Sequence, residues 1–164
     1  MELVDKFDNK RIPLNKTTTR YADIKGEYSQ SVHVLIINNK NELLIQKRTP
    51  DKKVYPNLWS VTSGGINAGE TSLNAVYREC MEELGITIHP SEVELIASYR
   101  RTFDFLDIWL VKKDIELSEI IMQKDEVSEV KWISFDEFEN IIKNNQTPPA
   151  VQTYFDFARK LLQL

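Results

Sequence analysis

The stretch GGINAGETSLNAVYRECMEELGI, from Gly64 to Ile86, decides the fold of this chain. Apolar residues recur three or four positions apart within it, which predicts an amphipathic helix over Ser72–Leu84. Thr71 or Ser72 is suited to cap the start of this helix. Gly85 is suited to end it, because glycine readily adopts the left-handed conformation found just beyond helix C-termini.

The predicted helix carries three carboxylates on one side. Glu79, Glu82 and Glu83 lie at helical neighbour spacings, and like charges at such spacings are mildly destabilising unless something neutralises them. A hard cation would do so. Oxygen ligands without a nearby His or Cys cluster favour Mg²⁺, or Mn²⁺, over zinc. The alternative is a solvated helix face with an Arg78–Glu82 ion pair.

The spacing of this stretch resembles the box of the Nudix hydrolases. Cys80 stands where that box usually has an aliphatic residue, and a buried cysteine behaves as a small apolar one. The resemblance implies an α/β fold, an α/β/α sandwich in which helices flank a mixed β-sheet. The matching positions are Gly64, Glu70, Arg78, Glu79, Glu82, Glu83, Gly85 and Ile86.

The resemblance implies a Mg²⁺-dependent pyrophosphohydrolase in which water attacks phosphorus in a small diphosphate, such as a nucleoside diphosphate linked to another group. Either Glu79 or a distant loop glutamate serves as general base, with Glu126 favoured over Asp104, Asp107 and Glu129, which are predicted to be surface acids. The metal ligands are Glu79, Glu82 and Glu83, with Glu70 joining either the Arg78 ion-pair network or the metal shell through water. The catalytic candidates are Glu79, Arg78, Glu82 and Glu126, and the substrate-binding candidates are Lys47, Arg48, Gly64 and Gly65.

Two other functions remain open at this point. Residues outside the box resemble a branch that includes the isopentenyl diphosphate isomerases. Those isomerases carry a catalytic cysteine and a metal-binding histidine on either side of the glycine that matches Gly64, whereas this chain has Ser63 and Gly65. The third function is a catalytically silent sensor that binds a nucleotide to regulate a partner. Such a protein would not need every metal-binding glutamate of the box.

The composition limits the classes of partner. A length of 164 residues fits a single domain over 1–164, with an N-terminal extension at 1–29, the box at 64–86 and a C-terminal helix at 151–162. The net charge of −4 argues against an extended nucleic acid as partner. No apolar run is long enough for a signal peptide or membrane span, so a cytoplasmic location is expected. A homodimer remains open.

The remaining pattern predicts strands and two further helices. Ser31–Asn38 and Glu42–Lys47 are predicted to form a hairpin. Val93–Phe103 and Phe105–Lys112 are predicted either to pair or to form one bent strand. Gly64 and Gly65 are expected to let backbone amides approach phosphate or to form the tight turn into the helix. His33 and Cys80 are predicted to lie in the core, and His89 at the surface.

Overall fold

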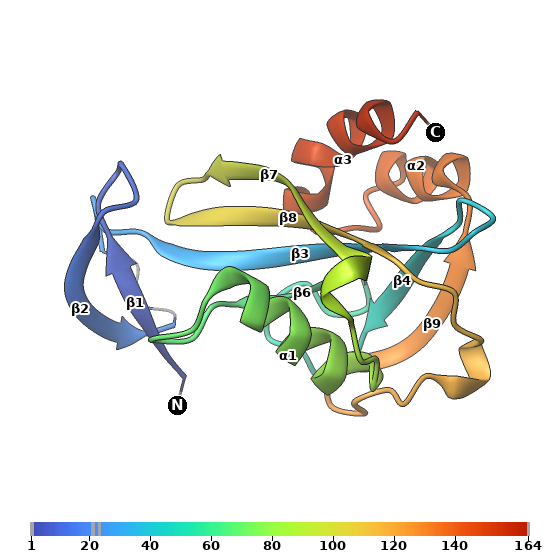
Figure 1. The fold of residues 1–164 in the computed structure, drawn as a ribbon, viewed down its shortest axis with the longest axis horizontal. Coiled ribbons are helices and arrows are strands. Elements are labelled where there is room, and N and C mark those ends of the chain that lie inside the picture. Colours follow the sequence, from blue (N-terminus) through green and yellow to red (C-terminus); the bar gives the residue numbers. More distant parts are fainter. Residues whose placement is uncertain (1, 21, 23, 164) are drawn as a thin grey trace.

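The computed structural model describes residues 2–20, 22 and 24–163 and centres on a mixed sheet of seven strands (Figure 1). Two short 3-10 helices, Pro90–Glu92 and Leu117–Glu119, interrupt the loops. The strands are β1 Leu3–Phe7, β2 Pro13–Thr19, β3 Ser29–Ile37, β4 Leu43–Arg48, β5 Trp59–Ser60, β6 Thr62–Gly65, β7 Val93–Arg100, β8 Asp104–Lys112 and β9 Val127–Ile133. The helices are α1 Ser72–Leu84, α2 Phe135–Lys143 and α3 Pro149–Leu161.

The main path of the sheet runs β5-β4-β3-β8-β7, while β6 pairs with β3 and β9 with β4. The β3–β8 pair is parallel, from Ser29 opposite Asp104 to Ile37 opposite Lys112. The other pairs in this sheet are antiparallel, including β7 with β8, which are therefore two strands and not one bent segment. The prediction of a mixed sheet is confirmed.

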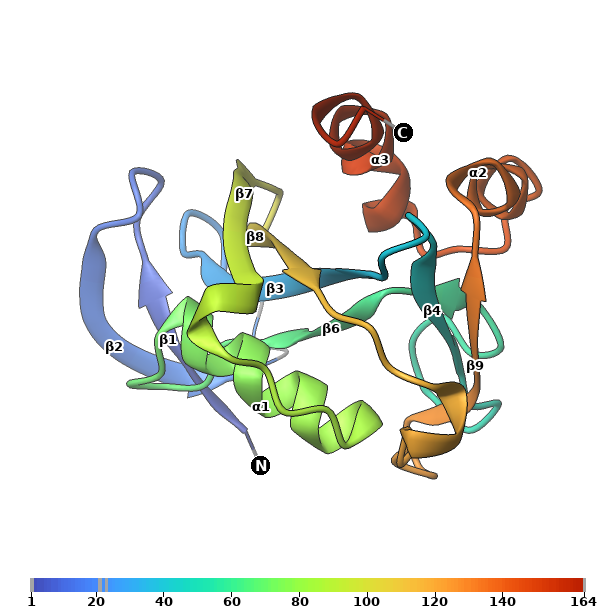
Figure 2. The same cartoon turned by 45° about the vertical axis from the view of Figure 1, so that its right-hand side comes forward.

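Helices cover both faces of the sheet, as the Nudix resemblance implied (Figures 1 and 2). The reason is the alternation of side chains along β3. Val32, Val34 and Ile36 belong to the apolar cluster that contains α1 residues. Leu35 and Ile37 belong to the cluster formed with α2 and α3. The chain thus forms an α/β/α sandwich.

The predicted hairpin between β3 and β4 is only partly correct. The two strands meet at one register pair, Ile37 opposite Leu43, and then diverge. Beyond that point β6 takes the edge of β3, and β5 takes the edge of β4. Because each edge has its own hydrogen-bonding partner, β3 and β4 can separate without leaving backbone groups unpaired.

The N-terminal extension forms a β1–β2 hairpin beside the start of α1 (Figure 1). The Ala68 amide donates to the Leu3 carbonyl at 2.8 Å, and the Gly69 amide donates to Asp5 Oδ2 at 2.7 Å. The sequence analysis predicted no strands here, because β2 is largely exposed and lacks an apolar face. The extension is therefore bound to the turn that precedes α1.

Helix α3 begins at Pro149, two residues before the predicted start at Val151. Proline is well accommodated in the first helical turn, where its missing N–H has no intrahelical partner, so the second proline starts this helix instead of breaking it. Within the described residues, no helix is long and apolar enough to span a membrane.

Candidate active site

Helix α1 holds the three glutamates in different surroundings. Its range matches the prediction, with the Thr71 side chain accepting the Asn74 amide and Gly85 ending it at φ +68°. Glu79 and Glu83 are buried, at 6% and 4% exposure, while the Glu82 side chain is 52% exposed. Two of the three carboxylates of this amphipathic helix are therefore buried, on the side of the helix that packs against the sheet.

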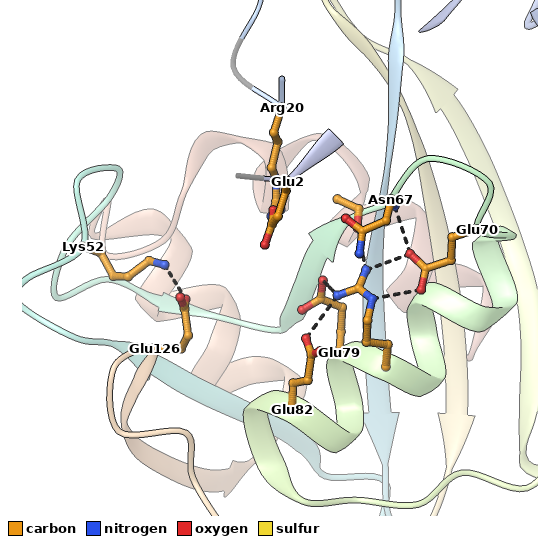
Figure 3. Close-up of polar contacts among 10 residues, drawn as sticks. Glu2, Arg20, Lys52, Asn67, Glu70, Glu79, Glu82 and Glu126 are labelled. Atoms are coloured by element: carbon orange, nitrogen blue, oxygen red, sulfur yellow. Dashed lines mark hydrogen bonds and ion pairs between the residues drawn. The ribbon is translucent and has the colours of Figure 1, made fainter. Parts of the chain in front are cut away.

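Arg78 pairs with Glu70, Glu79 and Glu82, the three glutamates that Figure 3 labels on and before α1. Its Nε and Nη2 donate to the two oxygens of Glu70, each at 2.9 Å. Nη1 donates to Glu79 at 2.6 Å and to Glu82 at 3.2 Å, and Nη2 also reaches the Gly65 carbonyl at 2.8 Å. Hydrogen bonds to Glu70, with the charge of Glu79, raise the pKa of Arg78 despite partial burial. The guanidinium therefore stays charged and orients three carboxylates.

Glu70 also fixes the turn that leads into α1. Its Oε2 accepts the Asn67 amide at 2.9 Å (Figure 3). Burial acts to raise the pKa of Glu70, but the hydrogen bonds from Arg78 and Asn67 outweigh it and lower that pKa. Glu70 is thus held ionised against Arg78, which supports a role in the network more directly than contact with a metal.

Glu83 lies deepest in the site. Its Oε2 accepts from Gln46 Nε2 at 2.8 Å and from the Ser63 amide at 3.4 Å. Gln46 is itself oriented by the Thr62 hydroxyl, which donates to its Oε1 at 3.1 Å. Burial and the nearby charge of Glu79 raise the pKa of Glu83 to about 8. The pKa of Glu79 is also raised, chiefly by burial, although Arg78 opposes the shift.

Gly64 and Gly65 do not form the turn into the helix, so the second of their two predicted roles is wrong. Both lie in β6, opposite Val32 and Ser31 of β3. A Cβ at Gly64 would lie 1.8 Å from Glu79 Oε1, and one at Gly65 would lie 2.8 Å from Arg20 Nε. The tight turn falls instead at Gly69, at φ +76°. These two glycines leave room for the Glu79 and Arg20 side chains.

The basic residues predicted to bind substrate occupy different places. Arg48 lines the cleft, and its guanidinium donates to the Val54 and Tyr55 carbonyls, which shapes the following loop. Lys47 lies outside the cleft lining, with its Nζ 5.7 Å from the centre of the Trp59 ring. Successive residues of a strand point to opposite faces, so Lys47 and Arg48 cannot both face the substrate.

Glu126 lines the cleft and forms an ion pair with Lys52 from the loop after β4 (Figure 3). Glu129 is exposed, as predicted, whereas Asp107 is only 2% exposed. The prediction of a surface acid at Asp107 is therefore wrong. Its two oxygens accept from Arg11 of the N-terminal hairpin at 2.8 and 2.6 Å, so burial is compensated by an ion pair.

The cleft has a volume of about 880 Å³ and opens where β3 and β4 diverge. Carboxylates from α1 lie on one side of its lining, and cationic side chains come from the N-terminal extension, the loop after β4 and the β7–β8 turn. The sequence analysis did not assign several of these cations, because nothing in their spacing links them to α1. The cationic lining residues are Arg20, Arg48, Lys52, Lys53, Arg78 and Arg101.

Comparisons with known proteins identify the family of this chain. The model of the NUDIX domain matches residues 27–155. The chain belongs to the Nudix family. An uncharacterised Nudix hydrolase from Listeria innocua is 37% identical over 166 residues, which cover 100% of this chain and 95% of the relative. The Nudix domain and its hydrolase homologues support hydrolase activity on pyrophosphate-containing compounds.

Solved structures of this family share the fold. DR0079 from Deinococcus radiodurans superposes with a TM-score of 0.76 at 20% identity, covering 89% of this chain and 91% of that one. The NUDIX domain of Shewanella oneidensis NrtR, solved with ADP ribose, gives a TM-score of 0.65 at 16% identity and covers 81% and 87% of the two chains. At these identities the likeness concerns the fold alone.

The carboxylate oxygens of helix α1 are ligands of the chemical type that a hard divalent cation prefers. Burial raises the pKa of both Glu79 and Glu83, and the charge of Glu79 raises that of Glu83 further, so a positively charged ion would stabilise both carboxylates. Within the described part of the chain, no three His, Cys, Asp or Glu side chains converge as a ligand set. Glu82 instead faces Arg78, so it would have to rotate from that ion pair to join the other two.

Proposed function

We propose that this Nudix hydrolase is a Mg²⁺-dependent pyrophosphohydrolase. Its substrate is a nucleoside diphosphate linked to another group, or a similar small diphosphate. The observation that carries the proposal is the pair of buried carboxylates, Glu79 and Glu83, lining a cleft that several cationic side chains also line. Such an arrangement suits a ligand in which a divalent cation and phosphate groups enter together.

Glu79, Glu82 and Glu83 would hold the metal, and Mn²⁺ could replace Mg²⁺ at oxygen ligands of this kind. When bound, the metal would offset phosphate charge and lower the pKa of a coordinated water. Arg78 keeps Glu79 in place through its 2.6 Å ion pair and contacts Glu82 at a longer distance of 3.2 Å. Gln46 keeps one oxygen of Glu83 directed inward.

The cationic residues of the cleft bind and orient the diphosphate. Lys52 and Lys53 lie on the loop shaped by Arg48, and Arg20 enters from the N-terminal extension. Positive groups fixed around a phosphate stabilise charge that spreads over its oxygens during transfer. Glu126 is proposed as the general base, since it lines this cleft and forms an ion pair there with Lys52.

Isomerase chemistry is disfavoured by the space around Gly65. A Cβ at this position would lie within 3.1 Å of three atoms of the Arg20 guanidinium group. A histidine there, as in the isopentenyl diphosphate isomerases, would displace Arg20 from the cleft. Ser63 also replaces the catalytic cysteine, and a serine hydroxyl is a much weaker acid than a thiol.

A turnover screen tests the proposal. The protein is incubated with Mg²⁺ and a panel of ADP-ribose, nucleotide sugars, dinucleoside polyphosphates and prenyl diphosphates, and phosphate-containing products are measured. ADP-ribose is a reasonable first substrate because it binds the NrtR NUDIX domain. We expect turnover that stops when a chelator removes Mg²⁺. Tight binding of one nucleotide without turnover would instead support a sensor, and conversion of isopentenyl diphosphate to its allylic isomer would support the isomerase.

Variants then connect turnover to the site. Glu82→Gln and Glu83→Gln each remove one charged ligand with little change in shape, so turnover should fall by at least about 100-fold. Glu94→Gln is the matched control, because Glu94 is an exposed residue of β7 outside the cleft. Undiminished turnover in both α1 variants would reject the proposed metal site.

A further inference from the structure

His33 lies in the floor of the cleft and takes no part in the function described so far. It is on β3, opposite Ser63 of β6, and it lines the cleft while being only 7% exposed. Its Nδ1 lies 2.9 Å from the hydroxyl of Tyr154 on α3. Its other ring nitrogen, Nε2, forms no hydrogen bond within the described residues, and it is not among their fully buried unpaired atoms, so it is accessible from the cleft. A nearly buried polar group therefore borders the substrate cleft unpaired.

Tyr154 determines which nitrogen of His33 carries the proton. The tyrosine is 1% exposed, and within the described residues the imidazole is the hydrogen-bond partner of its hydroxyl. A buried hydroxyl that cannot reach water needs an acceptor for its own proton. The Tyr154 O–H therefore donates to Nδ1, and the proton of the neutral imidazole resides on Nε2.

The imidazole stays neutral over the working range of pH. Burial, reinforced by the charge of Arg101, lowers the pKa of His33 to about 3, although Asp104 opposes the shift. The two rings also meet edge to face, with centroids 5.5 Å apart and an interplanar angle of 83°, so the imidazole is held by packing as well. His33 therefore presents an uncharged N–H donor to the cleft, unlike the charged arginines and lysines there. A neutral donor does not compete with a bound cation for the ligand.

We propose that His33 is a substrate-binding residue whose Nε2–H donates a hydrogen bond to a phosphate oxygen of the bound diphosphate. Tyr154 is a positioning residue that acts through His33, which connects α3 to the floor of the cleft. The proposal rests on the proposed function for the identity of the ligand. A phosphate oxygen is the acceptor that fits, because it is charged and the surrounding cations already attract it to this cleft.

The tautomer can be measured directly by ¹H–¹⁵N nuclear magnetic resonance. The chain has two histidines, and the exposed His89 can be changed to Gln to assign the spectrum. We expect His33 to carry its proton on Nε2 in the full-length protein and Tyr154→Phe to give a mixture of tautomers. Methylene diphosphonate with Mg²⁺ should shift the Nε2–H signal of His33 and leave His89 unchanged. A proton on Nδ1 in the wild type, or no shift with this probe, would overturn the proposal.

Kinetics with the best substrate from the screen provide the second test. His33→Gln keeps an N–H donor near the position of Nε2, whereas His33→Asn is too short to reach it. A hydrogen bond to a charged acceptor corresponds to about a 10- to 100-fold change in binding. We therefore expect KM to rise by that factor in His33→Asn, to recover largely in His33→Gln, and kcat to change much less. Equal KM values in the two variants would overturn the donor role.

The two proposals fail in different ways. Absence of turnover by the wild type on every substrate would reject the pyrophosphohydrolase, while the resonance experiment would still decide whether His33 contacts a diphosphate. Thermal unfolding of each variant identifies loss of folding. If Tyr154→Phe does not fold, the comparison of His33→Gln with His33→Asn still tests the inference, because both keep Tyr154.

Discussion

Replacing Gly64 with Ala should separate activity from stability more clearly than any change to a charged residue. The added Cβ would lie 1.8 Å from Glu79 Oε1 and 2.0 Å from Cδ. Ordinary contact begins at 3.4 Å, so the carboxylate must move from 1.8 Å to at least 3.4 Å, a shift of about 1.6 Å. That shift pulls Glu79 out of its 2.6 Å ion pair with Arg78.

The expected effect on stability is small compared with the effect on rate. The atoms that must move are the end of a flexible side chain, so the cost to the free energy of unfolding should stay at or below about 2 kcal/mol. For a domain of this size, that lowers Tm by about 4–8 °C. Misplacement of a catalytic group by 1 Å can cost about 100-fold, so kcat should fall by at least this factor.

The assay is steady-state turnover with Mg²⁺, paired with circular dichroism melting and with Mn²⁺ binding followed by electron paramagnetic resonance. Gly65→Ala is the matched comparison on the same strand. Its Cβ meets Arg20 at 2.8 Å instead of a metal ligand, so KM should rise while Mn²⁺ affinity is kept. Wild-type kcat and Mn²⁺ affinity in a folded Gly64→Ala protein would refute the claim that β6 makes room for a working Glu79.

Three further predictions concern charge. In metal-free protein the pKa of Glu83, about 8, exceeds its ordinary value of 4.5, so unfolding free energy should decline between about pH 4.5 and 8, and Glu83→Gln should remove this decline. Mg²⁺ binding at pH 7 should therefore release protons, measurable by calorimetry in buffers of different ionisation enthalpy. Asp107→Asn should cost about 2 kcal/mol in urea unfolding, because Arg11 loses its buried partner. Glu126→Gln should lower kcat by about 100-fold or more, while Glu129→Gln should not.

Each of these predictions has an outcome that contradicts it. Metal binding without proton release would place the ionisation of Glu83 below pH 7. Lys16→Ala, which breaks an exposed ion pair, should cost less than about 1 kcal/mol. If Asp107→Asn lowered the free energy of unfolding no more than Lys16→Ala does, burial of the Arg11–Asp107 pair would be unimportant for stability. A normal kcat in Glu126→Gln would leave Glu79 as the general base.

The local features of the site could be read from the sequence. The helix range Ser72–Leu84 and its capping at Thr71 and Gly85 follow from periodicity and from backbone preferences over a few residues. The same geometry places Glu79, Glu82 and Glu83 close together along this helix, although Glu82 faces Arg78 while the other two are buried. These features depend on contacts between near neighbours in the chain, which is why spacing alone was sufficient to predict them.

The partners of those glutamates could not be predicted in the same way. Gln46 is 37 residues from Glu83, and Tyr154 is 121 residues from His33. Each pair joins a strand to a helix that packs on the sheet, so its members meet only in the folded chain. The prediction that His33 belongs to the core was correct about burial, yet it could not show that one edge of the ring borders the cleft. Asp107 was misjudged for a related reason, since its partner Arg11 comes from the N-terminal hairpin.

The divergence of β3 and β4 explains why this fold places a charged site within its core. If β3 and β4 stayed paired along their length, hydrogen-bonded backbone would fill the region between them. Instead, β6 hydrogen-bonds to the edge of β3 and β5 to the edge of β4, which leaves space between the two strands. Glu83 and Gln46 occupy the base of that space. The glycine pair in β6 has no side chains, which leaves room for the Glu79 and Arg20 side chains. Burying the charges of Glu79 and Glu83 opposes folding in the absence of a counter-ion, because burial raises the pKa of both and the charge of Glu79 adds to the shift of Glu83. Binding of a divalent cation would therefore stabilise the protein and prepare it for catalysis through the same two carboxylates.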